Sequence, residues 1–143
     1  METTARPAEG REVELVEKAA EAAQKAGCAY SNFHVGAAML LDDGTIITGF
    51  NWESPAFSVG ICAERMCLFT ALSQRNICAN DVIMFAIHGQ TKAPISPCGA
   101  CRQVMMDILG PDCPVLLSNC DNEIIRTTVS ELLPMGFKEG DLK

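Results

Sequence analysis

Two stretches of apolar and β-branched residues flank an Asp-Gly pair in the first half of the chain. The first, FHVGAAMLL, covers residues 33–41, and the second, TIITGFNWE, covers residues 45–53. Runs of this composition are typical of strands, and an Asp-Gly dipeptide between two of them is a strong local signal for a β-hairpin. The pattern therefore predicts two antiparallel strands joined by a turn at residues 42–44.

The rest of the chain consists of segments with helical spacing and short β-rich runs. Helices are predicted over residues 11–26, 62–74, 97–109 and 128–134, and strands over residues 82–89, 114–119 and 124–128. In the last helix, Thr128 and Glu131 have the spacing of a capping box. A hairpin followed by alternating helices and strands indicates an α/β fold. The prediction is a three-layer α-β-α arrangement, with helices covering both faces of a mixed five-stranded sheet.

Length and composition limit the number of domains. The chain has 143 residues, of which 48% are hydrophobic and 20% are charged, and this composition is that of a globular protein. Such a length suits one domain, and no repeat or long linker divides the chain. We expect a single domain over residues 11–143, preceded by a loose tail over residues 1–10.

The charge balance argues against two classes of partner. The net charge is −7, and the 11 Lys and Arg residues form no run. Proteins that bind nucleic acid or anionic membranes usually carry a basic patch, so neither is expected as the main partner. No apolar stretch approaches the ~18 residues that a membrane helix needs. The first ten residues, METTARPAEG, lack the apolar region of a signal peptide.

These features lead to the expectation of a cytoplasmic protein. In a reducing compartment, metal binding and catalysis are commoner roles for cysteine than disulfides. The chain contains eight cysteines. Their most informative arrangement is the only C-x-x-C pair, Cys98 and Cys101.

This pair lies at the start of the predicted helix over residues 97–109. Helical residues at i and i+3 share one face, so both thiolates can reach one zinc ion at Zn–S distances of about 2.3 Å. Unpaired N–H groups and the positive end of the helix dipole lower thiol pKa values in the first turn. By itself the pair also allows a disulfide, a redox couple or a structural metal site.

A third ligand is available from the other helix that starts with a cysteine, in the segment ICAERM. If the two helices pack side by side, their N-termini converge and Cys62 joins Cys98 and Cys101. Three protein ligands leave the fourth tetrahedral position of zinc for water, which is the catalytic arrangement. Glu64 would then lie close to that water without binding the metal.

Several motifs, in order, resemble those of the zinc-dependent cytidine deaminases of the small homotetrameric type. Residues 62–65 read CAER and residues 96–103 read SPCGACRQ. They fit the three-cysteine variant of the signature H-x-E…P-C-x-x-C, with Cys62 in the place of the histidine. Three further segments are similar, namely YSNFHVGAAML, NWE and SELLPMGFKEGDL, so the resemblance runs from about Ala29 to Leu142.

The resemblance implies a hydrolytic deaminase of pyrimidine salvage that converts cytidine and 2′-deoxycytidine to uridine and 2′-deoxyuridine and releases ammonia. It implies one zinc ion per subunit of a homotetramer, with Glu64 as the proton shuttle. Arg65 would offset the negative charge of the three thiolates, and Gln103 would brace the site. Without the resemblance, Arg65 also reads as an ordinary surface arginine.

The resemblance also implies the substrate contacts. Asn51 and Glu53, two apart on one face of a strand, match the residues that bind the sugar hydroxyls. Phe33 would pack against the base, although on sequence grounds it is equally an ordinary core aromatic. The remaining implied contacts are the Ala63 N–H and the Ser96 C=O, which would read the base, and Phe57 and Phe137, which would act across subunits.

The chain departs from the family pattern beside these residues. Residues 51–54 read NWES where the family usually has NVEN, and Phe57 stands where a tyrosine is common. Ala29 replaces the usual proline. We expect Trp52 to point away from the sugar, and the departures put the substrate range in doubt.

Three alternatives remain open from the sequence. The first is a structural zinc module with a closed four-ligand site, which needs a fourth Cys or His. The second is a thiol redox protein that uses the CGAC segment at residues 98–101. The third is a related deaminase that acts on nucleic acid or on modified or antibiotic cytosine nucleosides, against which the acidity and the intact Asn51 and Glu53 weigh.

Overall fold

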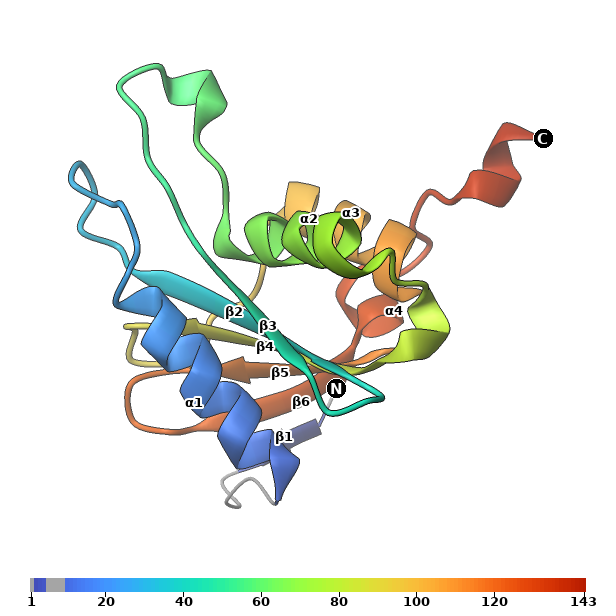
Figure 1. Ribbon diagram of the computed structural model, residues 1–143, viewed down its shortest axis with the longest axis horizontal. Helices are drawn as coiled ribbons and strands as arrows, with labels where there is room; N and C mark the ends of the chain where they lie inside the picture. Colours follow the sequence, from blue (N-terminus) through green and yellow to red (C-terminus); the bar gives the residue numbers. More distant parts are fainter. Residues whose placement is uncertain (1, 5–9) are drawn as a thin grey trace.

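The protein forms three layers, a mixed sheet with helices on both faces (Figure 1). The computed structural model describes residues 2–4 and 10–143. The sheet has six strands in the order β1-β6-β5-β4-β2-β3. The strands are β1 (Glu2–Thr4), β2 (Val35–Leu41), β3 (Ile46–Phe50), β4 (Val82–Gly89), β5 (Pro114–Ser118) and β6 (Ile124–Thr128). The helices are α1 (Arg11–Ala23), α2 (Ala63–Arg75), α3 (Gly99–Leu109) and α4 (Val129–Leu132).

The predicted hairpin is confirmed. Strands β2 and β3 pair antiparallel from Gly36 opposite Phe50 to Leu40 opposite Ile46. At the turn, Gly44 adopts a φ of 91°, a left-handed value that glycine tolerates at low steric cost. The turn is also attached to α1, because Arg11 of that helix donates to the Gly44 carbonyl at 3.0 Å.

Both faces of the central strands are buried, and each face has its own core. Along β2, Ala37, Met39 and Leu41 belong to the core under α2, α3 and α4, whereas Ala38 and Leu40 belong to the core under α1. Side chains alternate between the two faces of a strand, so a strand covered on both sides becomes apolar throughout. This explains why the whole of β2 is buried.

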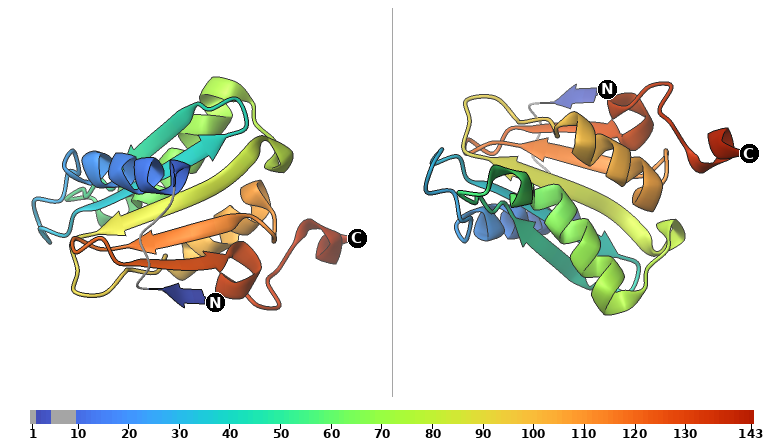
Figure 2. Two further views of the ribbon diagram at one scale, coloured as in Figure 1. Left: turned by 90° about the horizontal axis from the view of Figure 1, so that it is seen from below. Right: turned by 90° about the horizontal axis from the view of Figure 1, so that it is seen from above.

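The strand order brings two helix N-termini together. Strands β3 and β4 both pair antiparallel with β2, which lies between them, so they run parallel to each other. The segment after β3 leads into α2, and the segment after β4 leads into α3. Both helices therefore begin beyond the same end of the sheet and lie next to each other on one face (Figure 2).

The predicted number of strands needs a correction. The five predicted strands are present, but a sixth, β1, pairs antiparallel with β6, with Glu2 opposite Arg126 and Thr4 opposite Ile124. An edge strand presents unpaired backbone groups to which another segment can bind. The predicted loose tail over residues 1–10 is therefore wrong for Glu2–Thr4, and residues 1 and 5–9 lie outside the described residues.

Two helices are shorter than predicted. Helix α1 ends at Ala23, and α4 has only four residues. The end of α4 precedes Pro134, whose ring disfavours helical backbone at Leu133. At its start the capping interaction is present, because Thr128 Oγ1 accepts from the Glu131 N–H at 3.3 Å. No helix among the described residues is long and apolar enough to cross a membrane.

Helix α2 approaches β3 at a glycine. A Cβ added at Gly49 would lie 2.4 Å from the backbone nitrogen of Cys67 and 2.6 Å from the carbonyl oxygen of Ala63. These distances are shorter than van der Waals contact and involve backbone atoms of the helix, which cannot rotate away. Gly49 therefore sets the distance between β3 and the first turns of α2.

We predict that Gly49→Ala destabilises the protein by about 1–3 kcal/mol, because the added methyl group must displace the α2 backbone. Urea unfolding followed by circular dichroism measures the change. Gly140→Ala is the control, since nothing lies within 4 Å of the position that its Cβ would take. Equal stability of the two variants would contradict the close approach of α2.

Candidate metal centre

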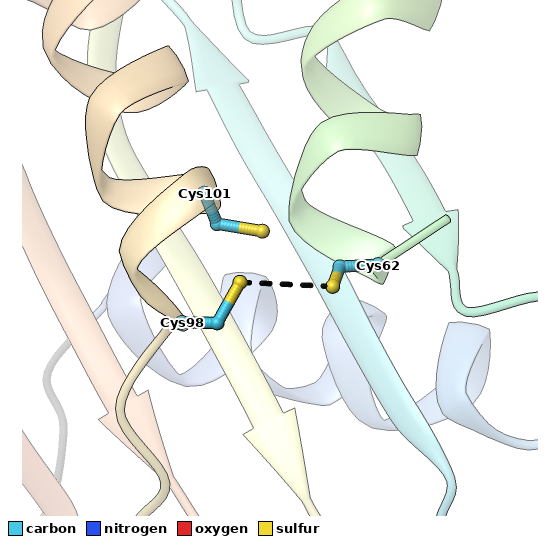
Figure 3. A group of neighbouring side chains, drawn as sticks. All are labelled: Cys62, Cys98 and Cys101. Carbon is cyan, nitrogen blue, oxygen red and sulfur yellow. Dashed lines mark hydrogen bonds between the residues drawn. The ribbon is translucent and has the colours of Figure 1, made fainter. Parts of the chain in front are cut away.

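Three cysteine thiols from two helices point toward one another (Figure 3). Cys62 precedes α2 as its N-cap, Cys98 precedes α3 in the same way, and Cys101 lies in the first turn of α3. The three Sγ atoms all lie within 4.8 Å of one another, and those of Cys62 and Cys98 are 3.9 Å apart. The grouping predicted from the sequence is thus present in the fold.

The thiols lie at the positive ends of two helix dipoles. Cys62 and Cys98 have extended backbone conformations, and neither side chain caps its helix. Their carbonyls already accept the first helical hydrogen bonds, from the N–H groups of Met66 and Arg102. Neither thiol is used to cap its helix, and both lie where the helix dipoles stabilise thiolate.

A guanidinium adds to this positive field. Arg65 Nη2 donates to Cys62 Sγ at 3.4 Å. A hydrogen bond from Cys101, with others from Arg65 and Cys98, lowers the pKa of Cys62 to about 5. The same Cys62 interaction and burial raise the pKa of Cys101. Metal ligation requires the thiolate form, so an ion with two positive charges would displace the remaining thiol protons.

The donor set fits zinc. Zinc binds cysteine thiolates tetrahedrally, and three protein ligands are the number found in catalytic zinc sites. None of the other described His, Cys, Asp or Glu side chains joins the cluster of Cys62, Cys98 and Cys101. A closed structural site needs a fourth such ligand, so the geometry favours a site with one open coordination position.

Glu64 is a buried carboxyl group next to this cluster. It lies in the first turn of α2 and is 4% exposed. Burial, with the nearby charge of Cys62, raises the pKa of Glu64 to about 7. A carboxyl group with such a pKa can hold and release a proton near neutral pH, as a general acid and base must.

The segment that carries Asn51 and Glu53 is held from both sides. Gly27 and Ile61 flank Trp52 and form backbone hydrogen bonds with residues 51–53. Isolated bridges thus replace the end of the strand predicted up to residue 53. Because side chains alternate along an extended segment, Trp52 lies on the opposite face from Asn51 and Glu53.

Trp52 packs on the backbone of Gly27. A Cβ added at Gly27 would lie 2.2 Å from Cε3 of the indole, and 53% of Trp52 remains exposed. The indole therefore packs on the segment that follows α1, and Trp52 also contributes to the lining of the cavity next to Cys62.

The amide of Asn51 and the carboxylate of Glu53 fasten the preceding loop. Asn51 Nδ2 donates to the Phe33 carbonyl at 2.8 Å, and Asn51 Oδ1 accepts from the Val35 N–H at 2.9 Å. Glu53 Oε1 accepts from the Ser31 N–H at 3.2 Å. These bonds, which no sequence pattern predicted, hold the loop that carries Phe33.

A cavity of about 280 Å³ lies beside this segment and reaches Cys62 of the metal cluster. It is lined by Tyr30, residues 51–54, Phe57, Gly60, Ile61, Cys62 and Arg65. Asn51 and Glu53, which the sequence predicted as substrate contacts, therefore line the same cavity as Cys62. A larger cavity, of about 740 Å³, lies away from the cysteines between α3, α4 and the C-terminal segment.

The aromatic residues of the sequence prediction are exposed. Phe33 is 44% exposed, so it is not the core aromatic that the sequence also allowed. Phe57 is 86% exposed and Phe137 is 54% exposed. Phe57 lies in η1 (Phe57–Val59), a 3-10 helix that stands out from the layered body (Figure 1).

The other residues of the prediction are distributed around the two helix starts. Ala63 is fully buried in the first turn of α2. Ser96 lies in the exposed loop before α3, and its hydroxyl accepts from Arg102. Gln103 does not face the thiols, because its Nε2 donates to the Phe137 carbonyl at 2.8 Å and to Asp107 at 3.0 Å.

Comparisons with known proteins agree with this geometry. Residues 10–116 match the family described as the cytidine and deoxycytidylate deaminase zinc-binding region. The chain is 43% identical to a cytidine deaminase of Halalkalibacterium halodurans, over 90% of this chain and 95% of that protein. It is 32% identical to a blasticidin-S deaminase of Bacillus cereus, over 89% and 92%. A crystal structure of a Burkholderia pseudomallei cytidine deaminase superposes with a TM-score of 0.84 at 40% identity, covering 87% of this chain and 98% of that one.

We predict that the purified protein binds one zinc ion per chain and that Cys101→Ser weakens zinc binding. Loss of a ligand should exceed the roughly 10–100-fold loss of affinity that removal of an outer-sphere partner causes. Competition with a chromophoric chelator measures the affinity. Cys78→Ser is the control, because Cys78 is an exposed thiol outside the cluster. Full zinc affinity in Cys101→Ser, or an equal loss in Cys78→Ser, would contradict the assignment.

Proposed function

Because this chain belongs to the cytidine and deoxycytidylate deaminase zinc-binding family, we propose that it hydrolyses the C4 amino group of cytidine and 2′-deoxycytidine. The products are uridine or 2′-deoxyuridine and ammonia. The observation that supports this proposal most directly is the cluster of Cys62, Cys98 and Cys101 beside the buried carboxyl group of Glu64. A metal cluster of three ligands with an adjacent proton carrier suits hydrolysis at a ring carbon.

Each thiol has a defined task in this proposal. Cys62, Cys98 and Cys101 hold the ion, and the helix N-termini together with Arg65 reduce the negative charge on sulfur. When bound, zinc supplies a Lewis acid that lowers the pKa of water. Arg65 acts on this chemistry through the Cys62 sulfur and does not touch the substrate.

Glu64 moves the protons. Its carboxylate takes a proton from the water that attacks C4 and passes it to N3 of the base. A second proton from the same water then reaches the leaving amino group through Glu64, so that ammonia departs. The elevated pKa of Glu64 permits both directions of transfer near neutral pH.

Asn51 and Glu53 bind the sugar hydroxyls. The bonds to the Phe33–Val35 backbone use one amide hydrogen and one lone pair of Asn51, and the Ser31 bond uses one oxygen of Glu53. A primary amide has a second hydrogen, and a carboxylate has a second oxygen, for a ligand. The negative charge of Glu53 favours a nucleoside over a nucleotide, because it repels phosphate.

The base packs against Phe33 in this proposal, and the partly exposed ring of Phe33 and its backbone bond to Asn51 support this role. The Ala63 N–H donates to O2 of the base, and the Ser96 carbonyl accepts from the N4 amino group. Both backbone groups lie within three residues of a proposed metal ligand. Their hydrogen bonds therefore hold the base with its C4 atom next to the metal site. Gln103 supports the site at a distance, since it holds the C-terminal segment to α3.

The active form is a homotetramer in this proposal. Phe57 and Phe137 are large exposed aromatic residues on segments that project from the body (Figure 1). The cavity of about 740 Å³ beside the C-terminal segment gives a second copy a surface to fill. We place Phe57 and Phe137 at the sites of neighbouring subunits, where burial of aromatic surface stabilises the contact.

The cellular setting follows from the cysteines and the charge. Eight unpaired cysteines, three of them gathered at a metal cluster, suit the reducing cytoplasm. The net charge of −7 disfavours nucleic acid as a substrate and anionic membranes as a partner.

A second candidate is a deaminase with a shifted substrate range. Residues Trp52, Ser54 and Phe57 line the cavity next to Cys62 and differ from the usual family residues. One relative is a blasticidin-S deaminase. A cytosine nucleoside with a modified sugar is therefore the competing substrate class.

We predict that Glu64→Gln lowers kcat/KM for cytidine by about 10²–10⁴-fold, because the amide cannot carry the proton. Loss of absorbance on conversion of cytidine to uridine measures the rate, and metal analysis checks that zinc stays bound. Full activity in Glu64→Gln would refute the mechanism.

A substrate panel separates the two candidate functions. Cytidine, 2′-deoxycytidine, cytidine monophosphate and blasticidin S are compared with the wild-type protein in the same assay. The proposal expects both nucleosides to be deaminated faster than the other two compounds. Preference for blasticidin S would establish the second candidate instead.

We predict that Phe137→Ala and Glu64→Gln each abolish most activity, and that co-expression of the two variants restores part of it. In a mixed tetramer, some sites combine an intact Glu64 with an intact Phe137 from a neighbour. Light scattering during size-exclusion chromatography measures the mass. A monomeric mass, or no recovery in the mixed protein, would contradict the shared site.

A further inference from the structure

Arg102 folds back over the loop that leads into α3. It lies in the first turn of the helix, directly after Cys101. Its Nε donates to the Pro97 carbonyl at 2.7 Å, and its Nη1 donates to the Leu132 carbonyl at 2.6 Å. Its Nη2 donates to the hydroxyl of Ser96. The half-buried guanidinium thus binds two backbone carbonyls and one side-chain hydroxyl.

The helix does not favour a cation at this position. The N-terminal turn of a helix carries a partial positive charge, which disfavours an arginine there. Hydrogen bonds from a charged donor are about twice as strong as neutral ones, and the planar guanidinium is suited to several acceptors at once. The three acceptors offset the unfavourable location, which indicates that the guanidinium serves the loop rather than the helix.

The peptide unit between Ser96 and Pro97 lies between two of these anchors. Arg102 binds the Ser96 side chain on one side of this unit and the Pro97 carbonyl on the other. The unit has no N–H of its own, because its nitrogen belongs to proline. Its one polar group is the Ser96 carbonyl, which none of the Arg102 bonds uses.

The third anchor connects the loop to another element. Leu132 is the last residue of α4 and is 3% exposed, so its backbone is packed in the core. The contact with its carbonyl fixes the guanidinium relative to the sheet and not only to its own helix. A displacement of the loop would therefore break a hydrogen bond to a buried residue of another element.

We propose that Arg102 is a positioning residue that directs the Ser96 carbonyl toward the N4 amino group of the base. This inference rests on the proposed deamination of cytidine. Arg102 does not contact the substrate. It fixes both ends of the peptide unit whose oxygen accepts from N4, and a small misplacement of such a group is costly for the rate.

The test compares Arg102→Ala with the wild-type protein on substrate and product. Cytidine has an N4 amino group that donates, whereas uridine has an oxygen at that position. We expect kcat/KM for cytidine to fall by about 10–100-fold in Arg102→Ala. The inhibition constant of uridine should change by less than about twofold, because uridine makes no N4 hydrogen bond. Bound zinc should remain at one ion per chain.

Two further variants complete the test. Arg75→Ala removes an arginine that binds Asp43 and Thr45 at the hairpin turn, and it should leave both constants unchanged. Added methylguanidinium should restore part of the activity of Arg102→Ala. Arg102→Lys should stay impaired, since one ammonium group cannot span three separated acceptors.

Each contrary outcome has a distinct meaning. If kcat/KM for cytidine and the affinity for uridine fell by the same factor in Arg102→Ala, the substitution would have disturbed the whole binding site. That outcome would overturn the positioning role. Loss of zinc from Arg102→Ala would place the effect on the metal ligands and also overturn it. Unchanged activity would do the same. A wild-type protein that binds zinc but does not deaminate cytidine would refute the proposed function itself.

Discussion

The direction of two strands determines where the site forms. Strands β3 and β4 are parallel because each is antiparallel to β2, so the segments that follow them emerge at the same end of the sheet. Each segment enters a helix, and the helices lie side by side on one face. Close packing at Gly49 keeps α2 near the sheet. Cysteines far apart in sequence thus meet because backbone topology brings two helix N-termini together.

The same arrangement accounts for the electrostatics of the site. Two helix dipoles and Arg65 favour negative charge on sulfur, while burial in the first turn of α2 favours the neutral form of Glu64. Neighbouring acidic groups therefore receive opposite shifts: the pKa of Cys62 is lowered and that of Glu64 is raised. One end of one helix thus carries both a thiol that favours the anionic form and a carboxyl group with a pKa near neutral pH.

Local signals predicted the parts of the structure that depend on local chemistry. The Asp-Gly turn predicted the hairpin, and the C-x-x-C spacing placed Cys98 and Cys101 on one face of a helix start, because these features depend on spacing within one element. Cys62 joined the predicted cluster only on the assumption that the two helices pack side by side, which the strand order satisfies. The strand β1 was missed, since three residues carry too little pattern and their pairing depends on the open edge of β6. The contacts of Asn51 and Arg102 were also missed. They depend on how loops return to the sheet, and no single-element pattern contains that information.

Side-chain hydrogen bonds fix the two loops next to the site, the one that carries Phe33 and the one before α3. Asn51 and Glu53 each hold the backbone near Phe33 while one side of each polar group stays available to a ligand. Arg102 likewise holds the loop before α3, through hydrogen bonds to Ser96, Pro97 and Leu132. Both loops are thus fixed before a ligand arrives, so binding does not have to order them, and preorganisation of this kind saves conformational entropy. The side chains that bound the cavity are therefore part of its framework, and a substitution at Asn51 or Glu53 changes loop geometry together with any contact to a ligand.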